Sequence, residues 1–225
     1  MKILAIETAS EACSVALGCG TDVEERYALS PRGHAEQVLP WVQELLSAAV
    51  LKLDELDVIA FSRGPGSFTS LRIGIGIVQG LAWGADLRVI PCSSLQIAAE
   101  VAAQSGIEQA LVAMDARMGE VYCGSYALND EGRMAALGDE FVGAPERLEP
   151  LLLEGMACVG NGFDRFPVLR SLSRNSPTVR PEIGPRAAAM IPMAESWLTS
   201  KAALPALDAQ PVYLRDKVAR KSTEN

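Results

Sequence analysis

Residues 59–84 read IAFSRGPGSFTSLRIGIGIVQGLAWG and carry the strongest structural signal of the chain. The apolar run that ends at Phe61 is typical of a buried strand. Gly64, Pro65 and Gly66 then predict a tight turn, because glycine tolerates positive φ and proline fixes its own φ. Residues 69–84 predict a helix, which Ser67 or Thr69 can cap. The stretch is therefore a strand, a turn and a helix in succession.

The residues on either side extend this unit. KILAIE (2–7) and SVALG (14–18) predict a β-hairpin, and residues 23–29 predict a third strand. Apolar residues recur at spacings of three and four over 34–51, which indicates an amphipathic helix. A short strand at 88–91 follows the helix of residues 69–84. This order of elements is that of a ribonuclease H-like unit, which we expect to occupy residues 1–105.

The second half of the chain repeats the opening weakly. ALVAMDARMGEVYCGSYAL (110–128) has the strand, turn and strand pattern of residues 3–17. Helices are predicted at 145–154 and 184–200, with a strand entering the glycine turn at 156–162 and a short strand-like piece from Pro211. We therefore expect an α/β fold with a smaller second lobe at 106–214, a reduced copy of the first, and a polar tail at 215–225.

Composition restricts the class of protein. The chain has 225 residues, 49% of them hydrophobic, and its opening lacks the basic flank and the long apolar core of a signal peptide. No run approaches the roughly 18 apolar residues that a membrane span requires, so we expect a cytoplasmic protein. Five cysteines without a CxxC pair indicate buried or semi-buried thiols, neither a disulfide framework nor a zinc site. A net charge of −8 argues against a broad phosphate-binding surface.

The glycine turn before a helix is a candidate site for anions, because backbone N–H groups and the helix dipole favour negative charge there. A structural turn with a cap explains the same residues equally well. Glu7 and Thr8, with Ser10 after them, lie at the end of the first strand, and Asp115, Arg117 and Gly119 hold the corresponding position in the second half. Gly160, Asn161 and Gly162 could be the remnant of an adenosine loop. The candidate nucleotide or anion contacts are Glu7, Thr8, Gly64, Gly66, Ser67 and Thr69.

Gly76, Gly80 and Gly84 form a stripe at four-residue spacing along the predicted helix of residues 69–84. Each glycine costs about 1 kcal/mol relative to alanine in an exposed helix, so close packing of another helix is the expected compensation. That helix is either residues 35–50 of the same chain or a helix of a partner.

His34 is the only histidine, and a metal site of the form HxxxH would need an imidazole where the chain has Val38. No metal site is predicted. Glu36 follows closely, but a glutamate near a helix N-terminus usually stabilises the helix dipole. A basic run near the C-terminus is either a solvated tail or an arm that contacts phosphate; it comprises Arg215, Lys217, Arg220 and Lys221.

Five segments together resemble the bacterial TsaB family, also called YeaZ. They are ILAIETASEACSVAL, HAEQVLPWVQELL, IAFSRGPGSFTSLRIGIGIVQGLA, VAMDARMGEVYCGSY and PVYLRD, and they cover most of the chain in order. The resemblance implies an actin-like (ASKHA) fold of two ribonuclease H-like lobes, the second one reduced. It also implies a role in forming N6-threonylcarbamoyladenosine in ANN-decoding tRNAs.

In that family the larger paralogue TsaD holds the metal and performs the transfer, so the resemblance implies a non-catalytic partner subunit. It further implies a homodimer, the ATPase TsaE as another partner, contact with tRNA only through the complex, and no cofactor of its own. ATP or ADP could lie at the shared interface, although Glu7 and Asn161 depart from the actin-like ATPase pattern. The helices 35–50 and 69–84 are the implied interface, with Val38, Leu39, Val42, Leu45, Leu46, Arg72, Ile73, Gly76, Ile77 and Gly80.

Two alternatives remain at this point. One is an enzyme, either glycopeptidase-like or an actin-like nucleotide-dependent kinase. The other is a direct RNA-binding module that acts through the basic tail.

Overall fold

The first sheet has five strands. In this computed structural model, which describes residues 1–29 and 33–215, the strand order is β3-β2-β1-β4-β5. The first three strands form an antiparallel meander, whereas β1, β4 and β5 run parallel. The bounds are β1 Lys2–Glu7, β2 Ala12–Cys19, β3 Asp22–Leu29, β4 Val58–Gly64 and β5 Arg88–Ser93.

The second sheet repeats this topology, with the order β11-β10-β6-β7-β8 and β9 also paired to β7. Its first three strands are again antiparallel neighbours, and β10 and β11 are again parallel to the opening strand β6. The weak sequence repeat is thus confirmed, and so are two ribonuclease H-like lobes. The bounds are β6 Gln109–Asp115, β7 Val121–Leu128, β8 Met134–Ala136, β9 Phe141–Gly143, β10 Ala157–Val159 and β11 Val179–Arg180.

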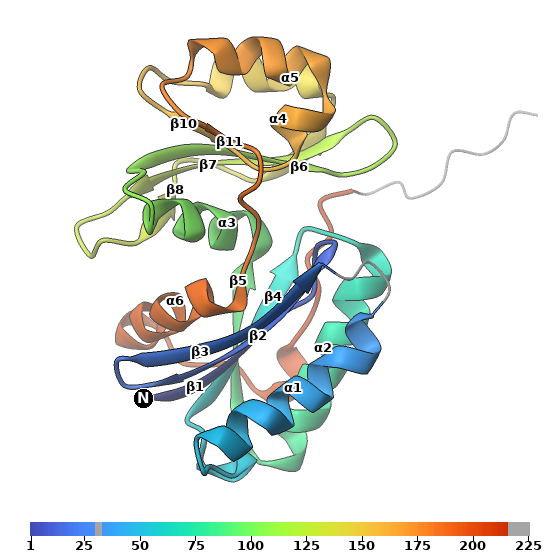
Figure 1. Cartoon of the computed structure of the whole chain (residues 1–225), viewed down its shortest axis with the longest axis vertical. Coiled ribbons are helices and arrows are strands. Elements are labelled where there is room, and N and C mark those ends of the chain that lie inside the picture. Colours follow the sequence, from blue (N-terminus) through green and yellow to red (C-terminus); the bar gives the residue numbers. More distant parts are fainter. Residues whose placement is uncertain (30–32, 216–225) are drawn as a thin grey trace, which may run out of the picture.

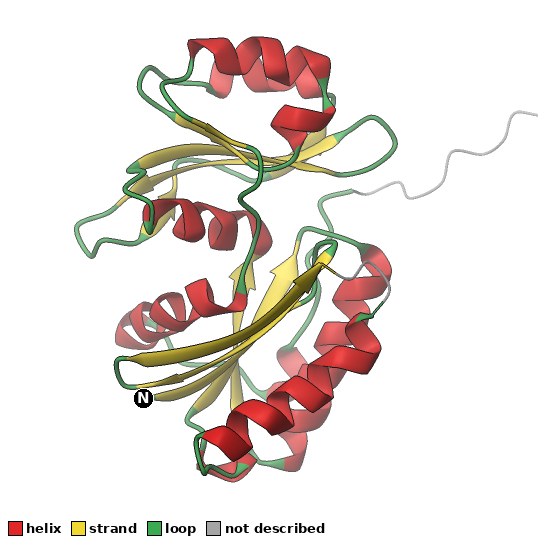
Figure 2. Ribbon diagram, in the orientation of Figure 1, coloured by secondary structure: helices red, strands yellow, loops and turns green. Residues whose placement is uncertain are grey.

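Helices lie on both faces of each sheet (Figure 1). α1 (His34–Ala48) and α2 (Phe68–Gly84) cover the outer face of the first sheet. α6 (Ala187–Ser200) and α3 (Ser94–Ala103) lie between the two sheets and contact each other. The far face of the second sheet carries α4 (Gly162–Arg165) and α5 (Pro167–Leu172) (Figure 2). Short 3-10 helices occur at Leu53–Glu55, Pro145–Leu151, Ser173–Asn175 and Ala206–Asp208.

Strand β1 shows why both faces of the first sheet are buried. Side chains of a strand alternate between faces, so Leu4 and Ile6 pack beneath α1 and α2 while Ile3 and Ala5 pack beneath α6. A strand covered on both sides must be apolar throughout. Four of the five cysteines are buried, Cys19 is partly buried and all five are free, which confirms the prediction of buried or semi-buried thiols.

The boundary between the lobes differs from the expected one. Residues 106–214 were expected to form the second lobe, but α6 packs against β1 and β2 of the first sheet. The chain then stays there: Val89 exchanges backbone hydrogen bonds with Leu204, and the Val212 N–H donates to the Arg63 carbonyl at 2.8 Å. The predicted polar tail lies outside the described residues from position 216 onward.

Two local expectations are wrong, and one helix was not expected. The piece that begins at Pro211 is not a strand, and residues 145–154 form a 3-10 helix that ends at Leu151 instead of an α-helix. Pro150 lacks a backbone donor, which favours such an early end. The sequence pattern gave no prediction of α3, whose alanine-rich stretch is buried nearly all round and shows little periodicity. Within residues 1–29 and 33–215, no helix is both long and apolar enough to cross a membrane.

Candidate functional site

A cleft lies between the lobes, with a cavity volume of about 390 Å³. Its wall in the first lobe consists of residues 9–11, the loop after β1, and residues 65–70, the turn that opens α2. The second lobe contributes residues 114–118 and Asn161, and residues 212–215 complete the wall. The cleft therefore gathers the turns that the sequence repeat had paired.

The two first-lobe loops are held together by close backbone contacts. The Ser67 N–H donates to the Ala9 carbonyl at 2.8 Å, and a Cβ on Gly66 would lie only 2.2 Å from the same oxygen. The Thr8 hydroxyl donates to the Ser70 carbonyl at 3.0 Å. A Cβ on Gly74 would lie 2.1 Å from that hydroxyl oxygen, so this glycine permits the contact. The loop after β1 is thus fixed to the first turns of α2.

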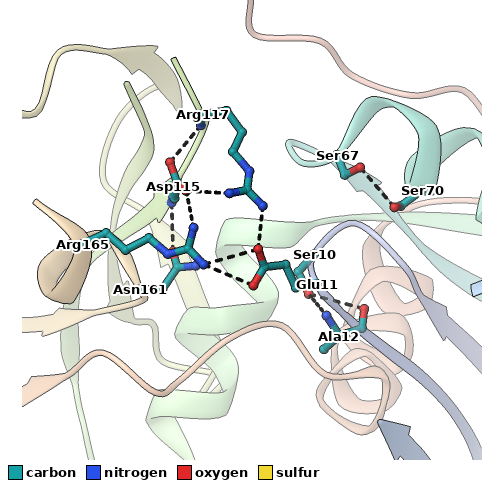
Figure 3. Close-up of polar contacts among 9 residues, drawn as sticks. All are labelled: Ser10, Glu11, Ala12, Ser67, Ser70, Asp115, Arg117, Asn161 and Arg165. Carbon is teal, nitrogen blue, oxygen red and sulfur yellow. Dashed lines mark hydrogen bonds and ion pairs between the residues drawn. The ribbon is translucent and has the colours of Figure 1, made fainter. Parts of the chain in front are cut away.

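Charged side chains bridge the lobes across the cleft (Figure 3). Glu11 of the first lobe accepts hydrogen bonds from Arg117 at 2.5 Å and from Arg165 at 3.2 Å. Arg165 also donates to Asp115 at 2.6 Å, and the Asn161 side chain accepts from the Asp115 backbone N–H at 2.9 Å. We call Glu11, Asp115, Arg117 and Arg165 the interlobe ion cluster. Its two carboxylates balance its two guanidinium groups, so an incoming anion would compete with Glu11.

The predicted anion contacts divide into two groups. Gly66, Ser67 and Thr69 line the cleft, whereas Glu7, Thr8 and Gly64 lie beneath it. Gly64 has φ of +99°, as the predicted turn requires. The predicted cap by Ser67 or Thr69 is wrong: α2 starts at Phe68 without a side-chain cap, because the Ser67 hydroxyl accepts instead from Ser70 at 3.0 Å.

Glu7 supports the loop from below. Its side chain is 0% exposed, and Oε1 accepts from the Ala9 N–H at 2.8 Å. Oε2 has no hydrogen-bond partner among the described residues. Burial raises the pKa of this carboxyl to about 8, against the smaller opposing effects of the Ala9 N–H and the Ser62 side chain. The carboxyl is therefore a protonated part of the core near neutral pH.

The outer side of α2 forms a second region with functional potential. A Cβ added at Gly76, Gly80 or Gly84 would meet nothing within 4 Å, so packing of α1 against this stripe is not its explanation. Arg72 is exposed on the same side, and Ile73 and Ile77 are half-buried along its flank. We call Arg72, Gly76, Gly80, Trp83 and Gly84 the α2 glycine face.

The α1 residues of the predicted interface mostly face inward. Val38, Val42, Leu45 and Leu46 are buried against the first sheet and belong to its core. They recur at helical spacing on the side that contacts the sheet, so an apolar stripe marks packing and not a docking face. Leu39 directly follows Val38, points away from the sheet and is 49% exposed.

Trp83 was missing from the predicted interface although a signal for it exists. It is 70% exposed and lies three residues after Gly80, which places both on one side of the helix. A large exposed aromatic beside a glycine stripe is typical of an interface anchor. Glu11 and Arg165, in contrast, are 154 residues apart, and no local pattern pairs them.

His34 has a structural position. Its ring is 2% exposed, and Nε2 lies 3.1 Å from the Ala12 carbonyl, which ties the start of α1 to β2. Val38, one turn later, lies in the core. In the described part of the chain, no three or more His, Cys, Asp or Glu side chains are grouped so that they could hold a metal ion.

Comparisons with known proteins agree with each other. Residues 28–171 match the family model described as TsaD, tRNA N6-adenosine threonylcarbamoyltransferase. The tRNA threonylcarbamoyladenosine biosynthesis protein TsaB of Escherichia coli K12 is 40% identical, covering 98% of this chain and 97% of the relative. TsaB of Haemophilus influenzae is 36% identical, covering 98% and 96%. The solved structure of YeaZ from Pseudomonas aeruginosa aligns with a TM-score of 0.87 at 36% identity, covering 95% of this chain and 99% of that one.

Proposed function

Because the chain belongs to the TsaB family of tRNA threonylcarbamoyladenosine biosynthesis proteins, we propose that it acts there as a non-catalytic partner subunit. Members of this family take part in the biosynthesis of the modified nucleoside N6-threonylcarbamoyladenosine, and so does this chain. In this proposal a larger TsaD-type paralogue holds the metal and performs the transfer to ANN-decoding tRNAs. The present chain supports that paralogue in the cytoplasm, TsaE joins the complex, and tRNA is contacted through the complex.

The observation that carries this proposal is the open α2 glycine face. Gly76, Gly80 and Gly84 each weaken an exposed helix by about 1 kcal/mol, and no neighbour in the described chain fills the space beside them. A helix of another protein could approach there more closely than ordinary side chains permit. Trp83 adds exposed apolar surface to the same face, and the exposed Leu39 of α1 lines a shallow pocket together with Leu81 of α2.

The polar residues support a role without chemistry of its own. His34 and Glu7 are both buried and hydrogen-bonded within the chain, so neither is poised against a substrate. The two arginines of the interlobe ion cluster already bind carboxylates. A nucleotide phosphate would therefore have to displace Glu11, which disfavours tight binding of ATP in the cleft by this chain alone. We place ATP or ADP, where it takes part, at the interface shared with the paralogue.

Self-association follows from the same face. If two copies dock through their α2 glycine faces, the homodimer and the complex with the paralogue exclude each other. Addition of the paralogue should then convert the homodimer into the complex.

The deciding experiment combines a pull-down with an activity assay. We expect the purified chain to bind the TsaD-type paralogue, and threonylcarbamoylation of tRNA by paralogue plus TsaE to require it. The chain alone should give no turnover of tRNA, of ATP or of glycopeptide substrates. Unaided turnover would refute the non-catalytic role, and full activity without the chain would refute the supporting role.

A further inference from the structure

Arg72 is the only charged side chain in the 17 residues of α2. It is exposed and lies one turn before Gly76, at the start of the α2 glycine face. The rest of that face is glycine and apolar surface. If a partner buries this face, the Arg72 charge must be paired with an acidic group, because burying a charge without a partner is unfavourable.

The Arg72 guanidinium is held in place from two sides. Its central carbon lies 3.8 Å from the centroid of the Phe68 ring, and its Nε donates to the Tyr213 hydroxyl at 3.0 Å. The Phe68 and Tyr213 rings lie 5.5 Å apart. Tyr213 is anchored by its neighbour Val212, whose backbone N–H bonds to Arg63 of β4. Much of the ordering that binding would otherwise require has therefore already occurred.

The terminal nitrogens of Arg72 have no acceptor in the described part of the chain. Nearby arginines behave differently: Arg117 and Arg165 pair with Glu11, and Arg215 pairs with Glu120. Arg72 does not line the interlobe cleft, although its stacking partners Phe68 and Tyr213 do. Its free edge is thus available at the α2 glycine face and not in the cleft.

We propose that Arg72 binds a carboxylate of the protein that docks on the α2 glycine face and so selects that partner. A planar guanidinium with two free Nη groups matches a carboxylate in a bidentate pair. A phosphate of RNA fits the geometry as well, but the net charge of −8 opposes approach of a polyanion. A partner without an acid at this position would leave the arginine buried and unpaired, which provides discrimination.

This inference rests on the proposed function for the identity of the partner, the TsaD-type paralogue. The paralogue should present an Asp or Glu against the first turn of α2. In the complex we expect Arg72 to bind that carboxylate.

The test measures binding of the purified paralogue by calorimetry at low and high salt. We expect Arg72→Ala to weaken binding by about 10- to 100-fold, and Arg72→Glu to weaken it further. Arg72→Lys should recover only part, because an ammonium lacks the planar fork. Tyr213→Phe removes the Nε partner and should weaken binding by a few fold. Arg174→Ala, an equal change of charge at an exposed site of the second lobe, is the matched control and should bind as the wild type does.

The outcomes separate this inference from the proposed function. If the wild type binds the paralogue and Arg72→Glu binds equally well, the carboxylate pairing is wrong while the partner role stands. If the wild type fails to bind, the proposed function itself fails. Loss of tRNA binding with unchanged paralogue binding in Arg72→Ala would overturn the inference in favour of a phosphate ligand. Recovery of Arg72→Glu by an acid-to-lysine change in the paralogue would identify the paired residue.

Discussion

Replacing Gly76 and Gly80 with leucine should stabilise the chain and destroy its assembly at the same time. An added Cβ at either position meets nothing within 4 Å in the folded chain. Each replacement therefore recovers most of the glycine penalty, about 0.5–1 kcal/mol. The double variant should gain about 1–2 kcal/mol, which corresponds to a rise in Tm of a few degrees for a chain of this size.

The same leucines would fill the space that a docking helix needs. We expect affinity for the TsaD-type paralogue to fall by at least about 100-fold, equivalent to about 2.8 kcal/mol. Self-association should be lost in parallel, since it uses the same face in the proposed function. Thermal unfolding, size-exclusion chromatography and calorimetry on one set of samples would measure all three effects.

Gly74→Ala provides a matched control on the same helix. Its new Cβ would lie 2.1 Å from the Thr8 hydroxyl oxygen, so the substitution overpacks the contact between α2 and the loop after β1. We expect a loss of about 1–3 kcal/mol despite the better helix propensity of alanine. A fall in Tm for the leucine variants would refute the open-face geometry, and unchanged assembly in stable leucine variants would refute the docking role of the face.

Three further changes test other parts of the structure. Glu7 has a raised pKa in the folded protein, so its contribution to stability is full below about pH 4.5 and is lost as the pH rises to about 8. Glu7→Gln should remove this loss, which is at most about 1.4 kcal/mol per pH unit. Urea unfolding across that pH range would measure it. If the free energy of unfolding depends on pH in the same way in Glu7→Gln and the wild type, Glu7 is not a buried protonated carboxyl. Glu11→Gln should cost less than about 1 kcal/mol because Glu11 is 43% exposed, and the effect should shrink at high salt. A salt-independent loss of several kcal/mol would show that the ion cluster is not the cause. Trp83→Ala should leave stability within about 0.5 kcal/mol and weaken paralogue binding more than 10-fold, whereas equal affinity would place the interface elsewhere.

Much of the fold followed from local patterns. The apolar run around Ile6, the glycine turn at Gly64 and the periodicity from Val38 onward each depend on neighbours a few positions away. The succession of strands and helices in the first lobe and its weak repeat in the second were therefore predictable. α3 was not, because a helix buried on nearly all sides lacks the polar face that makes periodicity visible.

The predicted interface illustrates the limit of one-dimensional periodicity. Val38 and Leu39 are adjacent and both apolar, and only the position of the first sheet decides that Val38 is core and Leu39 is surface. The glycine stripe likewise had two explanations from sequence, a helix of the same chain or a helix of another protein. The three-dimensional packing excludes the first, since α1 leaves the space beside Gly76 and Gly80 open.

The sequence by itself determined the class of fold, the tight turn before α2 and the family resemblance, because each depends on patterns of neighbouring residues. Tertiary structure alone decided that Glu7 lies beneath the cleft and that Glu11 meets Arg165 across it. It also decided that α6 returns to the first sheet and that Tyr213 orders Arg72 from 141 positions away. The physical reason is the same in each case. Burial, ion pairing and open space depend on segments far apart in the chain, whose meeting no local pattern encodes.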